Sequence, residues 1–273
     1  RLDSAKDNPE FDVWHGGPVD GYGAAAEKGL IEAYDSPTAK EIPDKYKDPK
    51  HYWTGVYVGV LGFCSNQKVL EEKGLQVPQS WDDLLKPELK GQISTAHPST
   101  SGTAFTTLWT QVVLRGSEDA GLDYMKKMHA NVLQYTKPGT APGQIAGRGD
   151  VAVGLVFSHD CVKYRDEGMK DLVVSFPKEG TGYEIGGVAL VKNSKHSEAA
   201  KKYIDWAISA DAQNLGQTVG SNQILTNPNA KTNDKMAKLD EINLIDYDFA
   251  AAAAAKPELT KRFDEEVAAK PRQ

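Results

Sequence analysis

Short apolar runs alternate with amphipathic stretches along most of the chain. The runs that predict strands are residues 11–14, 56–63, 151–157, 172–176 and 187–191. Several of them are apolar at consecutive positions, which is typical of strands that helices cover on both faces. Strands of this kind, separated by helical stretches, predict an α/β fold with largely parallel sheets.

Helices can be placed from their spacing and their end signals. One follows Ser197, which is placed to cap it, and its apolar positions repeat as i, i+3, i+4, i+7 and i+8. These positions are Ala200, Tyr203, Ile204, Ala207 and Ile208. Another helix begins near Ser101 and ends at Gly116, a residue type that commonly stops helices. A short helix has Thr140 as its cap and Pro142 in its first turn.

The chain has 273 residues, about twice the length of a typical domain, so we expect two lobes. Its residues are 40% hydrophobic and 26% charged, as in soluble globular proteins, which sets disordered and fibrous classes aside. The net charge is -6 and no basic stripe is present, which argues against a nucleic-acid partner. No run of about 18 apolar residues occurs, so the sequence predicts no membrane-spanning helix.

The first residues are typical of a piece of a longer protein. The chain starts at Arg1 without a methionine, and the polar residues 1–10 run directly into the apolar residues 11–14. We therefore expect a fragment or a processed form.

Two cysteines, Cys64 and Cys161, lie far apart in the sequence. They match no CxxC spacing and could not form a metal site alone. In an oxidising compartment they could form a disulfide, and otherwise they are two separate buried thiols. The spacing leaves both interpretations open.

Polar residues follow several predicted strands, at the sheet edge where α/β proteins bind ligands. The first such group is Trp14-His15-Gly16-Gly17-Pro18. Paired glycines let backbone N–H groups approach a ligand closely, although a structural turn explains them equally well.

The second group is Ser99-Thr100-Ser101-Gly102-Thr103, at a predicted helix start. Free N–H groups, the positive end of the helix dipole and three hydroxyls favour an anion there. Plain N-capping needs only one of those hydroxyls, so their clustering favours ligand contact. The segment before Pro142, including Thr140, repeats this pattern more weakly, and plain capping explains it.

The third group combines Ser158-His159-Asp160, directly after a strand, with Gly182-Tyr183-Glu184, directly before one. A histidine, two carboxylates and a tyrosine at strand ends can hydrogen-bond hydroxyls or ligate a hard cation. The alternative is a buried His–Asp pair that only fixes a loop. Catalytic templates such as GxSxG, HExxH and the P-loop are absent, so we expect no enzyme.

Five stretches together resemble the ABC-type solute-binding proteins of the ferric-iron, polyamine and phosphonate/sugar-phosphate group. They are VPQSWDDLL at 77–85, LKGQI at 89–93, PSTSGT at 98–103, GVALVKN at 187–193 and EAAKKYID at 198–205. The resemblance covers nearly the whole chain and implies the type II periplasmic-binding-protein fold. Two α/β lobes, joined by crossing hinge strands, then close on a ligand held in the cleft between them.

The resemblance also implies the organisation of the chain. Residues 1–91 and 184–273 would form one lobe and residues 92–183 the other. The family's first strand-helix-strand unit is represented only by its tail, so part of the cleft would be missing. The family works with an ABC permease in the inner membrane, in the periplasm or anchored outside a Gram-positive cell. We expect a monomer without a cofactor.

For the ligand, the resemblance favours a sugar phosphate over ferric ion. Iron-binding relatives typically use two adjacent tyrosines, whereas this chain has Tyr183-Glu184, so an iron site would use His15, Tyr183 and Glu184. His159, Asp160 and Glu184 resemble the hydroxyl-binding set of the sugar-phosphate branch. The full expected set is His15, Gly16, Ser101, Gly102, Thr103, Thr140, His159, Asp160, Tyr183 and Glu184, with the phosphate at the helix start near Ser101. A ligand sensor and a phosphate-ester enzyme with His159 as base are the alternatives from other classes.

Overall fold

The computed structural model describes residues 2–5 and 7–269 and divides into two compact units. Unit 1 comprises residues 1–59, 184–236 and 249–254, and unit 2 comprises residues 60–183, 237–248 and 255–273. No helix in the described part of the chain is long and apolar enough to cross a membrane.

Unit 1 is built on the strand β8 (Tyr183–Val191), which pairs antiparallel with β1 (Val13–Pro18) and β2 (Ile31–Glu32). The first part of the long strand β3 (Thr54–Asn66) pairs antiparallel with β9 (Ile224–Leu225). Its helices are α1 (Asp20–Glu27), α7 (Ser197–Ala207) and α8 (Ala210–Thr218), with 3₁₀ turns at Asp3–Ala5, Pro37–Glu41 and Asp44–Tyr46. Tyr22 of α1 is fully buried in a core that contains Ile31 and Ala189.

Unit 2 contains the second part of β3, which pairs antiparallel with β6 (Val153–Phe157) and β7 (Leu172–Ser175). The strand β4 (Ile93–Ala96) pairs in parallel with both β6 and β5 (Val132–Thr136). The helices are α2 (Gln67–Glu72), α3 (Gly102–Arg115), α4 (Glu118–His129), α5 (Ala141–Gly147) and α6 (Ser158–Asp166). Short 3₁₀ turns occupy Trp81–Leu85, Pro87–Leu89 and Leu239–Glu241.

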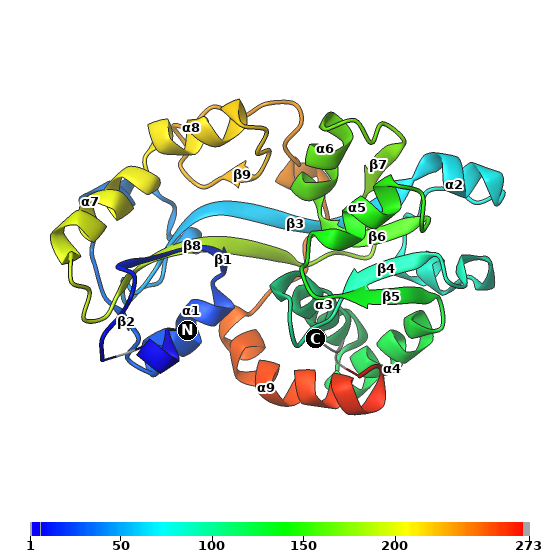
Figure 1. Cartoon of the computed structure of the whole chain (residues 1–273), viewed down its shortest axis with the longest axis horizontal. Helices are drawn as coiled ribbons and strands as arrows, with labels where there is room; N and C mark the ends of the chain where they lie inside the picture. The colour runs from blue at the N-terminus through cyan, green and yellow to red at the C-terminus, as the bar shows by residue number, and fades with distance from the viewer. Residues whose placement is uncertain (1, 6, 270–273) are drawn as a thin grey trace. The chain divides into compact units, whose positions relative to one another are not determined.

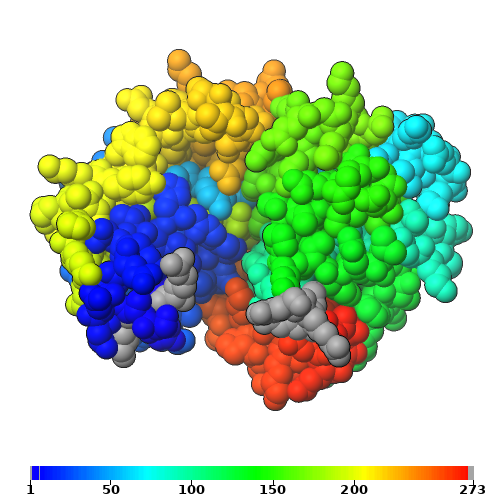
Figure 2. Space-filling model, viewed as in Figure 1, coloured from blue at the N-terminus to red at the C-terminus, as the bar shows by residue number. Residues whose placement is uncertain are grey.

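The strands of unit 2 have helices on both sides. The helices α5 and α6 cover one face, and α3 and α4 lie on the other (Figure 1). The last helix, α9 (Phe249–Glu266), contains Pro257, and its part from residue 255 onward belongs to unit 2. Figure 2 shows the red surface of this later part of α9 next to green residues of the same unit.

The strands confirm the expected α/β class but differ from the sequence pattern in direction. Because β3 and β8 run against their partners, the pairings are more antiparallel than the alternation of strands and helices predicts. The predicted strand at 56–63 lengthens to 13 residues in β3. The predicted strand at 151–157 begins only at Val153 in β6.

The helix ends show where local signals are strong. Ser101 caps α3 by accepting a hydrogen bond from the Ala104 N–H at 3.3 Å, and Gly116 ends the helix in the left-handed conformation, as predicted. The predicted cap Ser197 is instead the first residue of α7, and His196 holds the cap position without a side-chain bond. Tyr203, which the spacing places on a buried stripe of α7, is 40% exposed.

Cys64 of β3 and Cys161 of α6 form a disulfide, with Cα atoms 5.5 Å apart. The bond lies in a buried cluster with Val156, Tyr164 and Leu172. The disulfide therefore ties α6 to β3, the strand that lies between β6 and β7.

Candidate functional site

The start of α3 places polar groups at the end of a buried strand. The backbone leaves β4, turns at residues 97–101 and enters the helix at Gly102. In any α-helix the first N–H groups lack acceptors within the helix, so those of Gly102 and Thr103 can donate to an acceptor outside it. Ser101 and Thr103 are 8% and 9% exposed, so a ligand that contacts them would be largely shielded from water.

The backbone of Gly139 packs directly against these two hydroxyls. A Cβ atom at Gly139 would lie 2.7 Å from the Oγ of Ser101 and 2.3 Å from the Oγ1 of Thr103. Such distances are sterically forbidden, so only glycine allows this approach. The segment before α5 and the start of α3 therefore share one site.

Thr140 follows Gly139 but does not act as the predicted cap. It occupies the position before α5 in a helical conformation, and its side chain makes no cap hydrogen bond. Its carbonyl instead accepts a hydrogen bond at 3.2 Å from the hydroxyl of Tyr164, on α6. The ring of Tyr164 also packs on Gly143 of α5. This tyrosine thereby links the Gly139–Thr140 segment to α6.

Ser158, His159 and Asp160 form the first turn of α6, where the sequence predicts a loop. Phe157 holds the cap position without a side-chain cap, so the usual helix-start signal is missing. His159 stacks on the ring of Phe157, with the ring centroids 5.9 Å apart and the ring planes at 12° to each other.

Burial sets the charge state of both side chains. It lowers the pKa of His159 to about 4. It raises the pKa of Asp160 to about 6, with Lys163 acting in the opposite direction. The His159 Nε2 and Asp160 Oδ1 lie 3.8 Å apart, but a neutral imidazole forms no ion pair. At neutral pH the site therefore presents a neutral histidine, able to donate or accept, beside an ionised carboxylate.

In unit 1, the paired glycines belong to strand β1 itself, and the expectation that they follow the strand is corrected. Gly16 and Gly17 have φ values of 90° and 83°, and the pairing with β8 shifts register between His15 and Pro18. This is a β-bulge made possible by the left-handed conformations that glycine adopts at little cost. A Cβ at either glycine would meet open space, so both backbones are accessible.

Two tyrosines hold this bulge. The Tyr22 hydroxyl oxygen lies 2.8 Å from the carbonyl oxygen of Gly16 and 2.7 Å from that of Gly187, so these two acceptors share its single hydrogen. Burial, with the nearby Tyr57 and Glu184, raises the pKa of Tyr22 far above its usual value. The Gly17 N–H donates to the Tyr57 hydroxyl at 3.2 Å.

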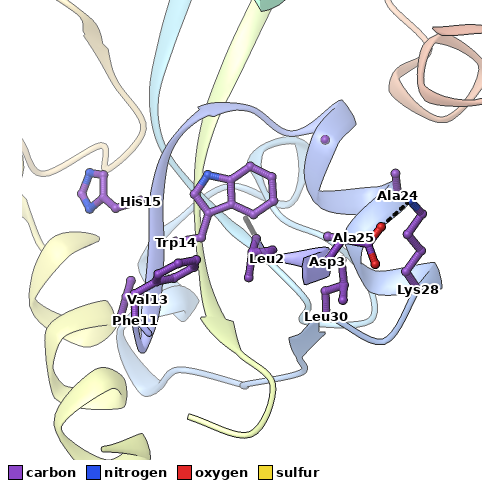
Figure 3. Close-up of a pocket in the computed structure, with 11 residues that line it drawn as sticks. Leu2, Asp3, Phe11, Val13, Trp14, His15, Ala24, Ala25, Lys28 and Leu30 are labelled. Atoms are coloured by element: carbon purple, nitrogen blue, oxygen red, sulfur yellow. Dashed lines mark hydrogen bonds and ion pairs between the residues drawn. The ribbon is translucent and has the colours of Figure 1, made fainter. Parts of the chain in front are cut away.

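His15 and Trp14 point to different sides of β1, as neighbouring strand residues do. Trp14 stacks on Tyr22 at 3.9 Å between ring centroids and lines an apolar pocket (Figure 3). That pocket has a volume of about 570 Å³ and includes Leu2 and Leu30. His15 also lines the pocket, and its Nδ1 lies 3.0 Å from the Tyr203 hydroxyl of α7. Desolvation lowers the pKa of His15.

Tyr183 and Glu184 are adjacent in β8, at the boundary between the units. Tyr183 ends a stretch of unit 2 and packs against Tyr247, with ring centroids 5.8 Å apart. Glu184 begins the next stretch of unit 1 and is 5% exposed. Within the described residues, no group of three or more His, Cys, Asp or Glu side chains could hold a metal ion.

Within unit 2, the start of α3 contacts the Gly139–Thr140 segment, which is hydrogen-bonded to Tyr164 of α6. Within unit 1, Tyr22 contacts Gly16, and His15 contacts Tyr203. Sequence reasoning missed Tyr164, Tyr22 and Tyr57, which carry no local signal. It did single out the segment of Gly139 and Thr140 but explained it by plain capping.

Residues 19–253 match the family model described as bacterial extracellular solute-binding protein. The chain belongs to this family, which confirms the resemblance carried by its sequence motifs. Several of its relatives are named periplasmic binding proteins.

Two relatives and one solved structure are similar to the chain over most of its length. An uncharacterized protein of Haemophilus influenzae is 40% identical over 263 residues, which are 94% of this chain and 75% of that protein. The Fe(3+)-binding periplasmic protein of Serratia marcescens is 24% identical over 233 residues, 83% of this chain and 67% of that protein. The periplasmic binding protein AfuA of Actinobacillus pleuropneumoniae, solved with exogenous fructose-6-phosphate bound, is 39% identical with a TM-score of 0.93. The match covers 97% of this chain and 85% of AfuA.

Proposed function

We propose that the chain is the solute-binding component of an ABC importer and that it captures a small phosphorylated organic ligand, a sugar phosphate. AfuA, which binds fructose-6-phosphate in its solved structure, supports this ligand class at 39% identity. The observation that carries the proposal is the arrangement in unit 2, where Gly139 contacts the hydroxyls at the start of α3 and the neighbouring Thr140 carbonyl accepts a hydrogen bond from Tyr164 in the last turn of α6.

This arrangement offers two kinds of polar group to one ligand. The N–H groups of Gly102 and Thr103, with the hydroxyls of Ser101 and Thr103, suit a phosphate. The Asp160 carboxylate accepts hydrogen bonds from sugar hydroxyls, and the neutral His159 can donate or accept. A sugar phosphate carries both groups, whereas inorganic phosphate would use only the first.

The remaining expected residues supply further contacts in the proposal. Glu184 accepts from ligand hydroxyls, and Tyr183 donates to the ligand. His15 and the open backbone of Gly16 complete the set. Thr140 takes part through its backbone, because its carbonyl already accepts from Tyr164.

The proposed location is the periplasm, or the outer face of a membrane-anchored form. The Cys64–Cys161 disulfide supports an oxidising compartment, where such bonds persist. The partner in this proposal is the permease of the importer, and the protein acts as a monomer without a cofactor.

Ferric ion is the second candidate ligand, with His15, Tyr183 and Glu184 as its site. The Serratia marcescens relative is an Fe(3+)-binding protein. Tyr247, whose ring lies 5.8 Å from that of Tyr183, also supplies a second phenol that the sequence around Tyr183 lacks. Phenolate oxygens suit a hard trivalent cation.

A calorimetric titration distinguishes the candidates. Fructose-6-phosphate, fructose, inorganic phosphate and ferric citrate are titrated separately into the protein. The proposal predicts saturable binding of fructose-6-phosphate, weaker binding of phosphate and none of fructose. Binding of ferric citrate alone would instead assign the protein to iron.

The Asp160→Ala variant then tests the site. We expect its affinity for fructose-6-phosphate to fall at least tenfold, because a charged acceptor of ligand hydroxyls is lost. An unchanged affinity in this variant would remove Asp160 from the site. Lys170, which is exposed and lies just after α6, gives a control as Lys170→Ala, for which we expect little change.

A further inference from the structure

The turn between β4 and α3, residues 97–101, decides where the proposed phosphate-binding groups point. This β4–α3 turn is organised around His97, whose side chain is fully buried. The His97 carbonyl accepts from the N–H groups of Thr100 and Ser101, each at 3.0 Å. Its N–H donates to the carbonyl of Thr136, at the end of β5, at 2.9 Å. The backbone of the turn is thus fixed at its first residue.

The side chains of the turn form hydrogen bonds with the last turns of α9 and with the residues that directly follow it. The Ser99 hydroxyl donates to the Asp264 Oδ1 at 2.8 Å. The His97 Nε2 lies 2.9 Å from the carbonyl of Ala268 and 3.4 Å from the same Asp264 oxygen. Because the Ser99 N–H donates to His97 Nδ1 at 3.3 Å, Nε2 is the nitrogen that carries a hydrogen toward α9.

Apolar packing keeps this part of α9 in place. Phe263 is fully buried, and its ring meets the His97 ring edge-on, with centroids 5.2 Å apart. Asp264 therefore stands next to an anchored residue and presents its carboxylate to the turn. Its side chain remains 34% exposed, on the rim of the contact.

We propose that Asp264 is a positioning residue for ligand binding. It holds the Ser99 hydroxyl and, through the β4–α3 turn, sets the direction of the hydroxyls and N–H groups of Ser101, Gly102 and Thr103. This inference rests on the proposed function, because it assigns the phosphate to the start of α3. It adds that ligand affinity depends on α9, because Asp264 lies 165 residues after Ser99 in the sequence.

The other interpretation is that the Ser99–Asp264 bond only attaches the end of α9 to unit 2. Both interpretations predict some loss of stability when the bond is removed. Only positioning predicts a loss of affinity that the conservative variant restores. Asp264→Asn keeps an oxygen acceptor for the Ser99 hydroxyl, whereas Asp264→Ala removes it.

The experiment measures fructose-6-phosphate affinity by calorimetry in Asp264→Ala, Asp264→Asn and the wild type. Glu265→Ala is the matched control, since Glu265 is the exposed neighbour on the same helix. We expect about a tenfold loss of affinity in Asp264→Ala, about threefold or less in Asp264→Asn and none in Glu265→Ala. Ser99→Ala should match Asp264→Ala, and the double variant should lose little more than either single one.

A lower unfolding temperature with unchanged affinity in Asp264→Ala would overturn the inference. A second measurement, independent of any ligand, is amide hydrogen exchange of residues 99–103 in the ligand-free protein. Positioning predicts faster exchange of these amides in Asp264→Ala and near wild-type exchange in Asp264→Asn. If the wild type binds no sugar phosphate, the proposed function fails. The exchange result still decides whether Asp264 orders the turn.

Discussion

In the Asp160→Asn variant, a neutral amide of nearly the same shape replaces the buried carboxylate at the start of α6. Burial raises the pKa of Asp160 from 3.8 to about 6, so the folded protein disfavours the ionised form. The side chain is 15% exposed, so solvent screens it little. The variant should therefore be more stable than the wild type at neutral pH when no ligand is present.

The size of this effect follows from the pKa values. The difference between about 6 and 3.8, at about 1.4 kcal/mol for each pH unit, gives at most about 3 kcal/mol. Because the folded pKa is the higher one, the folded state binds more protons than the unfolded state between these values. The protonated Asp160 therefore stabilises the folded wild type relative to its ionised form. This contribution to the free energy of unfolding is fully present below pH 3.8 and is lost as the pH rises through about 6. The gain in Asp160→Asn should thus be largest at pH 7 and disappear near pH 4.

Urea unfolding at pH 7, 5.5 and 4 measures the free energy of unfolding of both proteins. The same variant should bind fructose-6-phosphate more weakly at pH 7, because the amide accepts hydrogen bonds less strongly than a carboxylate. If Asp160→Asn is more stable but binds the ligand more weakly, the Asp160 carboxylate contributes to binding and lowers the stability of the ligand-free protein. A variant less stable than the wild type at pH 7, or a difference that does not change with pH, would refute the reasoning.

Further predictions concern the disulfide, the glycine contact and the bulge. The double variant Cys64→Ala/Cys161→Ala should lose stability, by up to about 5 kcal/mol in the chain-entropy estimate for a loop of about 100 residues, measured by urea unfolding. Gly139→Ala should weaken sugar-phosphate binding at least tenfold in calorimetry, because its Cβ would displace the hydroxyls of α3. Gly23→Ala, where a Cβ meets open space in α1, is the control and should bind normally. Tyr22→Phe should destabilise unit 1 by about 1–3 kcal/mol in thermal unfolding, because the carbonyls of Gly16 and Gly187 lose the one hydroxyl hydrogen that they share.

The parts of the fold that sequence predicts well have signals within a few residues. Ser101 and Gly116 define α3 by local chemistry, a hydroxyl that caps and a glycine that adopts the left-handed conformation. The start of α6 has no such signal, since Phe157 stands at the cap position. Packing in unit 2 decides that start, so the sequence predicts a loop where a helix begins.

In the candidate site, too, some features have local sequence signals and others depend on contacts made only in the folded chain. Residue chemistry and strand ends single out Ser101, His159 and Asp160 as candidates. The link between them depends on Gly139 touching Thr103, a contact between segments that only the folded chain brings together. The disulfide has the same origin, because its cysteines are 97 residues apart and spacing alone leaves their pairing open.

The measurement that tests the central claim most directly is an amide NMR titration of the protein with fructose-6-phosphate. The account predicts that the Gly102 and Thr103 amide resonances move strongly and saturate with the calorimetric affinity. Inorganic phosphate should move the same two resonances at higher concentration, and fructose should leave them unchanged. Saturable binding of fructose-6-phosphate with both resonances unmoved would contradict the claim that the start of α3 holds the phosphate.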